Sequence, residues 1–124
     1  MTLKECIEYV DGIKPNAFTN DQKTRWINEI EGRVQTEVFL WDPDTNHTTY
    51  TWENNQNTVL FVKPPYEEIY YEYLSAKIDY ANGEYDNCQN TQAMFEDVWI
   101  AFKRWFIRTY HPADWRGGCA CCKG

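Results

Sequence analysis

The sequence has few of the features that mark membrane, exported or histidine-dependent proteins. No apolar run among its 124 residues approaches the length of a membrane span. The first residues, Met1 to Glu5, lack the basic-then-apolar pattern of a signal peptide. Only two histidines, His47 and His111, are present, and no glycine-rich phosphate loop occurs. We therefore expect a protein that is made in a cytoplasm and has no membrane partner.

Basic residues are also scarce. The chain has 12 Lys and Arg against 19 Asp and Glu, which gives a formal net charge of −7. Such a surface repels phosphate backbones and anionic membranes. Direct, specific binding to nucleic acid is therefore disfavoured.

The cysteines do not form a recognisable framework. There are five, an odd number, and no export signal accompanies them, so a disulfide scaffold is not expected. Three lie in the segment Cys119-Ala120-Cys121-Cys122, which could bind a soft metal together with Cys88 or His111. The spacing does not supply two matched Cys-x-x-Cys pairs, so we favour a flexible tail over 113–124 with reactive thiols.

Other candidate sites have simpler explanations. A Cys–His nucleophile would need an orienting third group, which no spacing supplies. Asp42, Asp44, Asn46 and Thr48 alternate as in a calcium loop, but Pro43 interrupts them and His47 stands where that loop needs glycine. Acidic residues at Glu67-Glu68 suit the start of a helix. We expect no catalytic residues, no metal and no cofactor.

Two helices are predicted in the first third of the chain. Thr2 and Glu5 have capping-box spacing, and Leu3, Cys6, Ile7 and Val10 then share one helical face, up to a break at Gly12 and Pro15. Thr19 to Gln22 repeat the start signal. Ile27, Ile30, Val34, Val38 and Trp41 follow at spacings of three and four, which predicts a helix over 20–39 that Asp42-Pro43-Asp44 ends.

The next segment, about 41–62, is polar and then apolar. Thr48, Tyr50 and Trp52 alternate as in a strand, and Val59 to Val62 have the composition of a second strand after a turn at 54–57. This predicts an inserted β-hairpin or extended loop.

Two aromatic-rich helices follow. The first begins after Pro64-Pro65 and ends at Asn82-Gly83; the second spans about 86–110. Ile100 and Ile107 lie off the apolar stripe of the second helix, so we expect it to be central to a bundle or covered by another subunit. The fold class is therefore mainly α: one bundle of about four helices over 1–112 with the insert, and the tail 113–124.

Aromatic residues exceed what one small core needs, since they make up 17% of the chain with nine Tyr and six Trp. We assign to the core most of a set of seven: Ile69, Tyr73, Leu74, Val98, Trp99, Phe102 and Phe106. The surplus is Tyr70, Tyr71, Tyr80, Tyr85, Trp105 and Trp115. Because Tyr and Trp are favoured at interfaces, we expect about half of the surplus to face partners.

An ordered set of short pieces resembles the head–tail connector (adaptor) proteins of long-tailed phages. The pieces begin with Val10-Asp11, Lys14-Pro15-Asn16, Trp26, Glu29, Glu37-Val38, Leu60-Phe61-Val62 and Pro65-Tyr66. They continue with Tyr70 to Tyr73, Ala76, Ile78-Asp79, Asn82 to Tyr85 and Arg108 to Pro112. The match covers about residues 3–112, and the Cys-rich tail departs from the family pattern.

The resemblance implies a ring of copies, commonly twelve, beneath the portal protein at the capsid vertex. Such a ring extends the DNA channel, lets DNA pass without specific binding, and offers a platform to a downstream connector, stopper or tail protein in the virion neck. C-terminal segments of the family often dock into the portal. With the interface composition, this nominates as contact residues Tyr50, Trp52, Tyr70, Tyr71, Tyr85, Trp105, Arg108, Tyr110, Trp115 and Arg116.

An alternative from another functional class stays open. The chain could be a small cytoplasmic helical module that binds other proteins and responds to metal or oxidation through its thiols. One zinc per chain under reducing conditions, lost on changing Cys121 and Cys122 to Ser, would favour this alternative.

Overall fold

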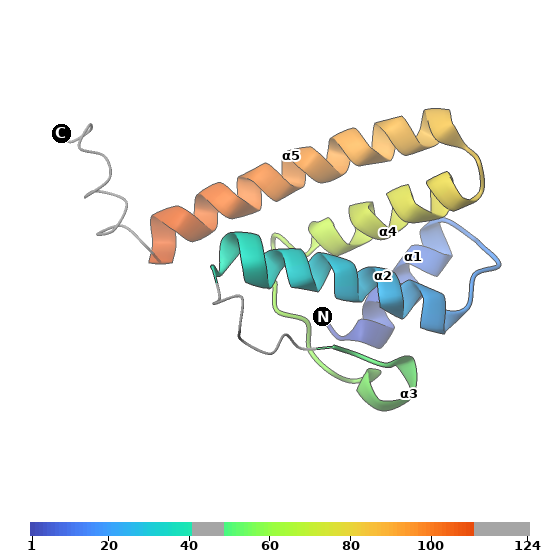
Figure 1. Ribbon diagram of the computed structural model, residues 1–124, viewed down its shortest axis with the longest axis horizontal. Helices are drawn as coiled ribbons and strands as arrows, with labels where there is room; N and C mark the ends of the chain where they lie inside the picture. Colours follow the sequence, from blue (N-terminus) through green and yellow to red (C-terminus); the bar gives the residue numbers. More distant parts are fainter. Residues whose placement is uncertain (41–48, 111–124) are drawn as a thin grey trace.

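The computed structural model describes residues 1–40 and 49–110, with only the backbone of Tyr110, and within them the chain is mainly helical (Figure 1). The elements are α1 (Leu3–Ile13), α2 (Asn20–Arg33), the π-helical turn η1 (Val34–Val38), α3 (Trp52–Asn55), α4 (Glu68–Ala81) and α5 (Tyr85–Tyr110). The predicted mainly-α class is confirmed.

Helix α4 is the centre of the packing. It forms an antiparallel hairpin with α5, and α1 and α2 both pack against it, while the single turn α3 lies near α1 and α2 (Figure 1). Helix α5 lies along one edge of the molecule and continues past the end of α4 (Figure 1). The sequence placed α5 either centrally or beneath another subunit, and within the described residues it is not central.

The two predicted N-terminal caps are confirmed. Thr2 Oγ1 accepts from the backbone N–H of Glu5 at 3.2 Å, and the Glu5 carboxylate accepts from the Thr2 N–H at 2.9 Å. Thr19 Oγ1 accepts from the Gln22 N–H at 3.1 Å and starts α2. Each cap satisfies backbone donors that the first helical turn leaves without partners.

The helix predicted over 20–39 matches the extent of α2 and η1 together, but its geometry changes from α-helical to π-helical after Arg33. After Arg33 the chain takes one π-helical turn, in which the Phe39 N–H donates to the Val34 carbonyl at 2.9 Å. Leu40 then has a φ of 57°, in the left-handed region. A π-turn inserts one residue into the helical repeat and rotates the side chains that follow, and the apolar spacing carries no signal for it.

The predicted β-hairpin is wrong for the described residues of the insert. Thr51 caps a helical turn, α3, where a strand was predicted. Its Oγ1 accepts from the Asn54 N–H at 3.3 Å, and Oδ1 of Asn55, the last residue of the turn, accepts from the Thr51 N–H at 2.9 Å. Local side-chain bonds of this kind compete with strand pairing.

The segment predicted as the second strand pairs with the N-terminus. Val59 forms an isolated antiparallel bridge with Thr2. The Leu60 N–H donates to the Met1 carbonyl at 2.9 Å, and the Leu3 N–H donates to the Thr58 carbonyl at 3.0 Å. This partner is remote in sequence, so turn signals near 54–57 could not reveal it. Two predicted features lie outside the described residues: the calcium-loop-like alternation from Asp42 to Thr48, and the tail at 113–124.

The core forms where the stripes of α1, α2, α4 and α5 meet. The four α1 residues expected on one face are all buried. Of the seven residues assigned to the core of the last two helices, Ile69, Leu74, Trp99 and Phe102 are buried. Tyr73, Val98 and Phe106 are half-buried and pack against the core. The periodicity of the sequence therefore identified most of the core.

The corner between α4 and α5 depends on one glycine. Gly83 has a φ of +78°, and its N–H donates to the Tyr80 carbonyl at 3.1 Å while the Glu84 N–H donates to the Asp79 carbonyl at 2.9 Å. Only glycine adopts this conformation without a steric penalty, so the Asn82-Gly83 break is confirmed with its cause.

The pair Gly83→Ala and Gly32→Ala should change stability in opposite directions. An added Cβ meets no atom within 4 Å at either site, so backbone conformation alone decides the sign. Gly83→Ala should cost about 1–2 kcal/mol because of its positive φ. Gly32→Ala, inside α2, should add about 0.5–1 kcal/mol. Urea denaturation measures both, and shifts of the same sign would contradict the explanation.

Candidate functional site

The Glu31 carboxylate is the most constrained polar group in the structure. Its side chain on α2 is 0% exposed. Tyr70 Oη of α4 donates to Oε1 at 2.6 Å, Tyr50 Oη donates to Oε2 at 2.9 Å, and the Phe61 N–H donates to Oε2 at 3.0 Å. A buried carboxylate needs such donors, because an unpaired one would cost several kcal/mol. Glu31 thereby joins α2, α4 and the segment between α3 and α4.

Neighbouring bonds extend this network to both ends of the insert. Tyr70 Oη also accepts from the Val62 N–H at 2.9 Å. Asn28 pairs with the backbone of Tyr50 in both directions, at 2.9 Å and 2.8 Å. Burial raises the pKa of Glu31 above its ordinary value, and the three hydrogen bonds oppose this rise. We call Glu31, Tyr50, Tyr70 and Phe61 the Glu31 clamp.

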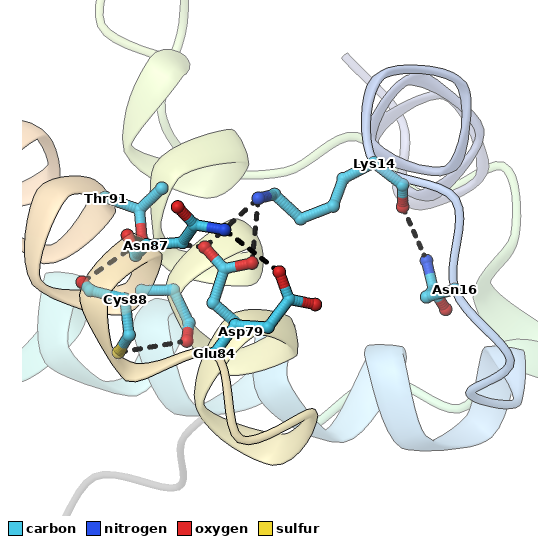
Figure 2. Close-up of polar contacts among 8 residues, drawn as sticks. Lys14, Asn16, Asp79, Glu84, Asn87, Cys88 and Thr91 are labelled. Atoms are coloured by element: carbon cyan, nitrogen blue, oxygen red, sulfur yellow. Dashed lines mark hydrogen bonds and ion pairs between the residues drawn. The ribbon is translucent and has the colours of Figure 1, made fainter.

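A second buried carboxylate joins α1 to the α4–α5 hairpin (Figure 2). Asp79 is 1% exposed, and its two oxygens accept from Lys14 Nζ at 2.8 and 3.1 Å. Thr91 Oγ1 of α5 donates to Asp79 Oδ2 at 3.3 Å. The Lys14 carbonyl in turn accepts from Asn16 Nδ2 at 3.0 Å. These partners occupy the carboxylate, so its evident task is to hold three helices together.

Two predicted interface residues are corrected by these networks. Tyr50 is 3% and Tyr70 is 0% exposed. Their hydroxyls bind Glu31, so both side chains belong to the interior instead of an exposed interface. The sequence counted Tyr70 as surplus because its intramolecular acceptor lies 39 positions away on α2.

The other predicted interface residues in the described part reach the surface to different degrees. Tyr85 is 59% exposed, and its ring lies 5.6 Å from that of Tyr80. Arg108 is exposed, and Trp52, Tyr71 and Trp105 are half-buried. Tyr71 packs on Tyr9 with ring centroids 4.3 Å apart, and Trp105 packs on Tyr66 at 5.1 Å. The side chain of Tyr110, together with Trp115 and Arg116, lies outside the described residues.

An open groove of about 630 Å³ lies between α2 and the α3 region. Arg25, Asn28 and Glu29 line one side, and Tyr50 and Trp52 line the other. Thr24 also lines it, and its buried hydroxyl has no hydrogen-bond partner in the described part of the chain. The groove places Trp52 beside charged groups of both signs.

The sequence did not reveal the burial of Glu31 and Gln35, two of the buried polar residues of α2 and η1. Glu31 stands four residues after Ile27 and three before Val34, so its position on the apolar stripe of α2 was a usable signal. Gln35 is 0% exposed, and neither its amide oxygen nor its amide nitrogen has a hydrogen-bond partner within the described residues. It lies in the π-helical turn, which the sequence did not predict.

The two described cysteines, Cys6 and Cys88, belong to no cluster that could hold a metal ion. Cys6 is 0% exposed, and burial raises the pKa of its thiol, which therefore stays protonated. Cys88 is half-buried, with Sγ 3.5 Å from the Ala76 carbonyl. Across 1–40 and 49–110, no three His, Cys, Asp or Glu side chains are placed to hold a metal ion. The Cys119–Cys122 segment lies outside these residues.

Comparisons with known proteins return no match: no family model, no curated protein and no solved structure is significantly similar to the chain. Among the described helices, none combines the length and apolar character needed to cross a bilayer.

Tyrosine-to-phenylalanine variants should rank the bonds of the Glu31 clamp. Tyr70→Phe loses a bond to a buried carboxylate and leaves the Val62 N–H without its acceptor, so it should cost about 3 kcal/mol. Tyr50→Phe loses one such bond and should cost about 2 kcal/mol. Tyr73→Phe is the matched control, since its hydroxyl binds the exposed Glu29 at 2.7 Å and should contribute less than about 1 kcal/mol. Equal losses in urea denaturation would contradict the ranking.

The raised pKa of Glu31 predicts how the free energy of unfolding changes with pH. A group with a raised folded-state pKa contributes its stability fully below the ordinary glutamate value of about 4.3 and loses it as pH rises through the folded value. The difference in unfolding free energy between wild type and Glu31→Gln should therefore shrink from pH 4 towards pH 7. A difference that grows with pH would show that hydrogen bonding outweighs burial and lowers this pKa.

Proposed function

We propose that this chain is a non-enzymatic structural protein of a phage virion, a head–tail connector that forms a ring at the portal vertex. The observation that carries the proposal is the ordered sequence resemblance over about residues 3–112, whose densest part, 70–85, covers most of α4 and the corner that follows it. The ring joins the portal protein to the next connector, stopper or tail protein in the virion neck.

The arrangement of polar groups supports an assembly role. The two buried carboxylates, Glu31 and Asp79, are both occupied by donors that hold helices together. The surface offers aromatic and apolar side chains instead, including Tyr80 at 65% and Tyr85 at 59% exposure. Exposed aromatic residues of this kind are enriched in protein interfaces.

The net charge suits a channel through which DNA moves. A formal charge of −7 per chain, repeated around a ring, keeps the phosphate backbone from adhering to the wall. The family resemblance implies this passage without specific binding. The same charge disfavours a role in reading DNA sequence.

Binding to the isolated portal ring tests the proposal and the predicted contact residue Tyr85 together. Wild-type chain should co-sediment with the portal of the same virus. Tyr85→Ser should weaken this binding at least about tenfold, because it removes an exposed aromatic anchor. Its own stability should stay within about 0.5 kcal/mol, as expected for a surface change.

Val59→Ser is the matched control, since Val59 is 50% exposed and is not among the predicted contacts. It should bind the portal as wild type does. Failure of the wild-type chain to bind the portal, alone or with the other neck proteins, would contradict the proposal. Binding of Tyr85→Ser at wild-type strength would remove Tyr85 from the interface and leave the function standing.

A further inference from the structure

The outer face of α5 is exposed and carries an ordered set of side chains. It lies opposite the core face of the helix, on the edge of the molecule that no other labelled helix covers (Figure 1). The residues that matter are exposed and recur at spacings of three and four: Met94, Asp97, Ile100, Ala101, Arg104 and Arg108. Met94 is 53% and Ile100 is 45% exposed.

The two arginines of this face are placed unfavourably for an isolated helix. Arg104 and Arg108 are four residues apart, and like charges at this spacing repel by a few tenths of a kcal/mol. Within the described residues neither one forms an ion pair. Positions that break a local rule without an internal gain are often positions of function.

Charge is segregated along the helix. Asp86, Glu96 and Asp97 are the charged residues of its first half, 85–97, and Lys103, Arg104 and Arg108 are those of its second half, 98–110. The helix dipole favours this order only within the first and last turns. It does not account for Asp97 and Arg104, which lie near the middle.

We propose that the outer face of α5 binds the same face of a second copy of this chain, with the two helices antiparallel. A two-fold axis between Ile100 and Ala101 brings each Asp97 level with Arg104 of the other copy. Packed helices lie about 8–10 Å apart, which these side chains span. Met94 then lies level with Ile107, and Ile100 with Ala101, so apolar residues flank both ion pairs.

A second copy fits this face better than a partner of one charge. An acidic partner such as DNA would meet Asp97 beside the arginines, and a purely apolar helix would bury both charges without partners, at a cost of several kcal/mol. A surface with the same two charges in reverse order satisfies both, and the antiparallel copy supplies it. The contact is isologous and closes at two chains.

This inference goes beyond the connector role and holds for the free protein whatever that role is. A ring requires contacts between two different patches of each copy, so the two-fold contact belongs to the chain before it joins the ring. In the two-chain species, this contact would cover the exposed apolar residues of α5.

Charge reversal tests the pairing on the full chain in reducing buffer. In sedimentation equilibrium, wild type should form a species of two 14.8 kDa chains that dissociates on dilution. Asp97→Arg and Arg104→Asp should each weaken self-association at least about tenfold, because each opposes like charges across the axis. An equimolar mixture of the two variants should restore the two-chain species, and so should the double variant.

Glu8→Arg is the matched control, since it makes the same charge change at an exposed position of α1 and should leave self-association unchanged. Circular dichroism establishes that each variant is folded. A monomeric wild type at all concentrations, a ladder of larger species, or no rescue in the mixture would overturn the inference. Arg104→Asp could leave the mass of the sedimenting species unchanged and yet abolish portal binding. The outer face of α5 would then bind the portal, so the inference would fail and the connector role would stand.

Discussion

The fold depends on satisfying one buried carboxylate. Glu31 is enclosed where α2, α4 and the segment leading into α4 meet, and donors from three separate parts of the chain reach its two oxygens. An unsatisfied buried charge costs several kcal/mol. Moving any one of these segments away would remove a donor from Glu31, so their relative positions depend on one another. The clamp thus orients α4, and α4 carries α5 through the Gly83 corner.

The second carboxylate, Asp79, acts on the opposite end of the same helix. Lys14 ties it to the end of α1, and Thr91 ties it to α5 (Figure 2). Helix α4 is therefore held near both ends by polar contacts and along its length by apolar packing. The two buried carboxylates, Glu31 and Asp79, are thus occupied by structural bonds. The candidates for interaction lie instead on Tyr80, Tyr85 and the outer face of α5.

Local signals in the sequence predicted the local structure well. The caps at Thr2 and Thr19, the glycine corner and the apolar faces of α1, α4 and α5 all depend on residues within a few positions of one another. The errors lie where a distant partner decides the outcome. The segment 58–60 pairs with Met1 to Leu3 instead of forming a hairpin, and Tyr50 and Tyr70 are buried because Glu31 accepts from both. The apolar periodicity also gave no signal for the π-helical turn after Arg33.

The functional proposal joins a sequence resemblance to a surface with exposed aromatic and apolar side chains. Its central claim is that the chain is a component of the virion neck. Cryo-electron microscopy of purified virions, with mass spectrometry of the same particles, tests this claim most directly. The account predicts a collar of this chain beneath the portal, with the symmetry of the portal ring and α5 recognisable as its longest helix. Complete virions that lack the chain would contradict it.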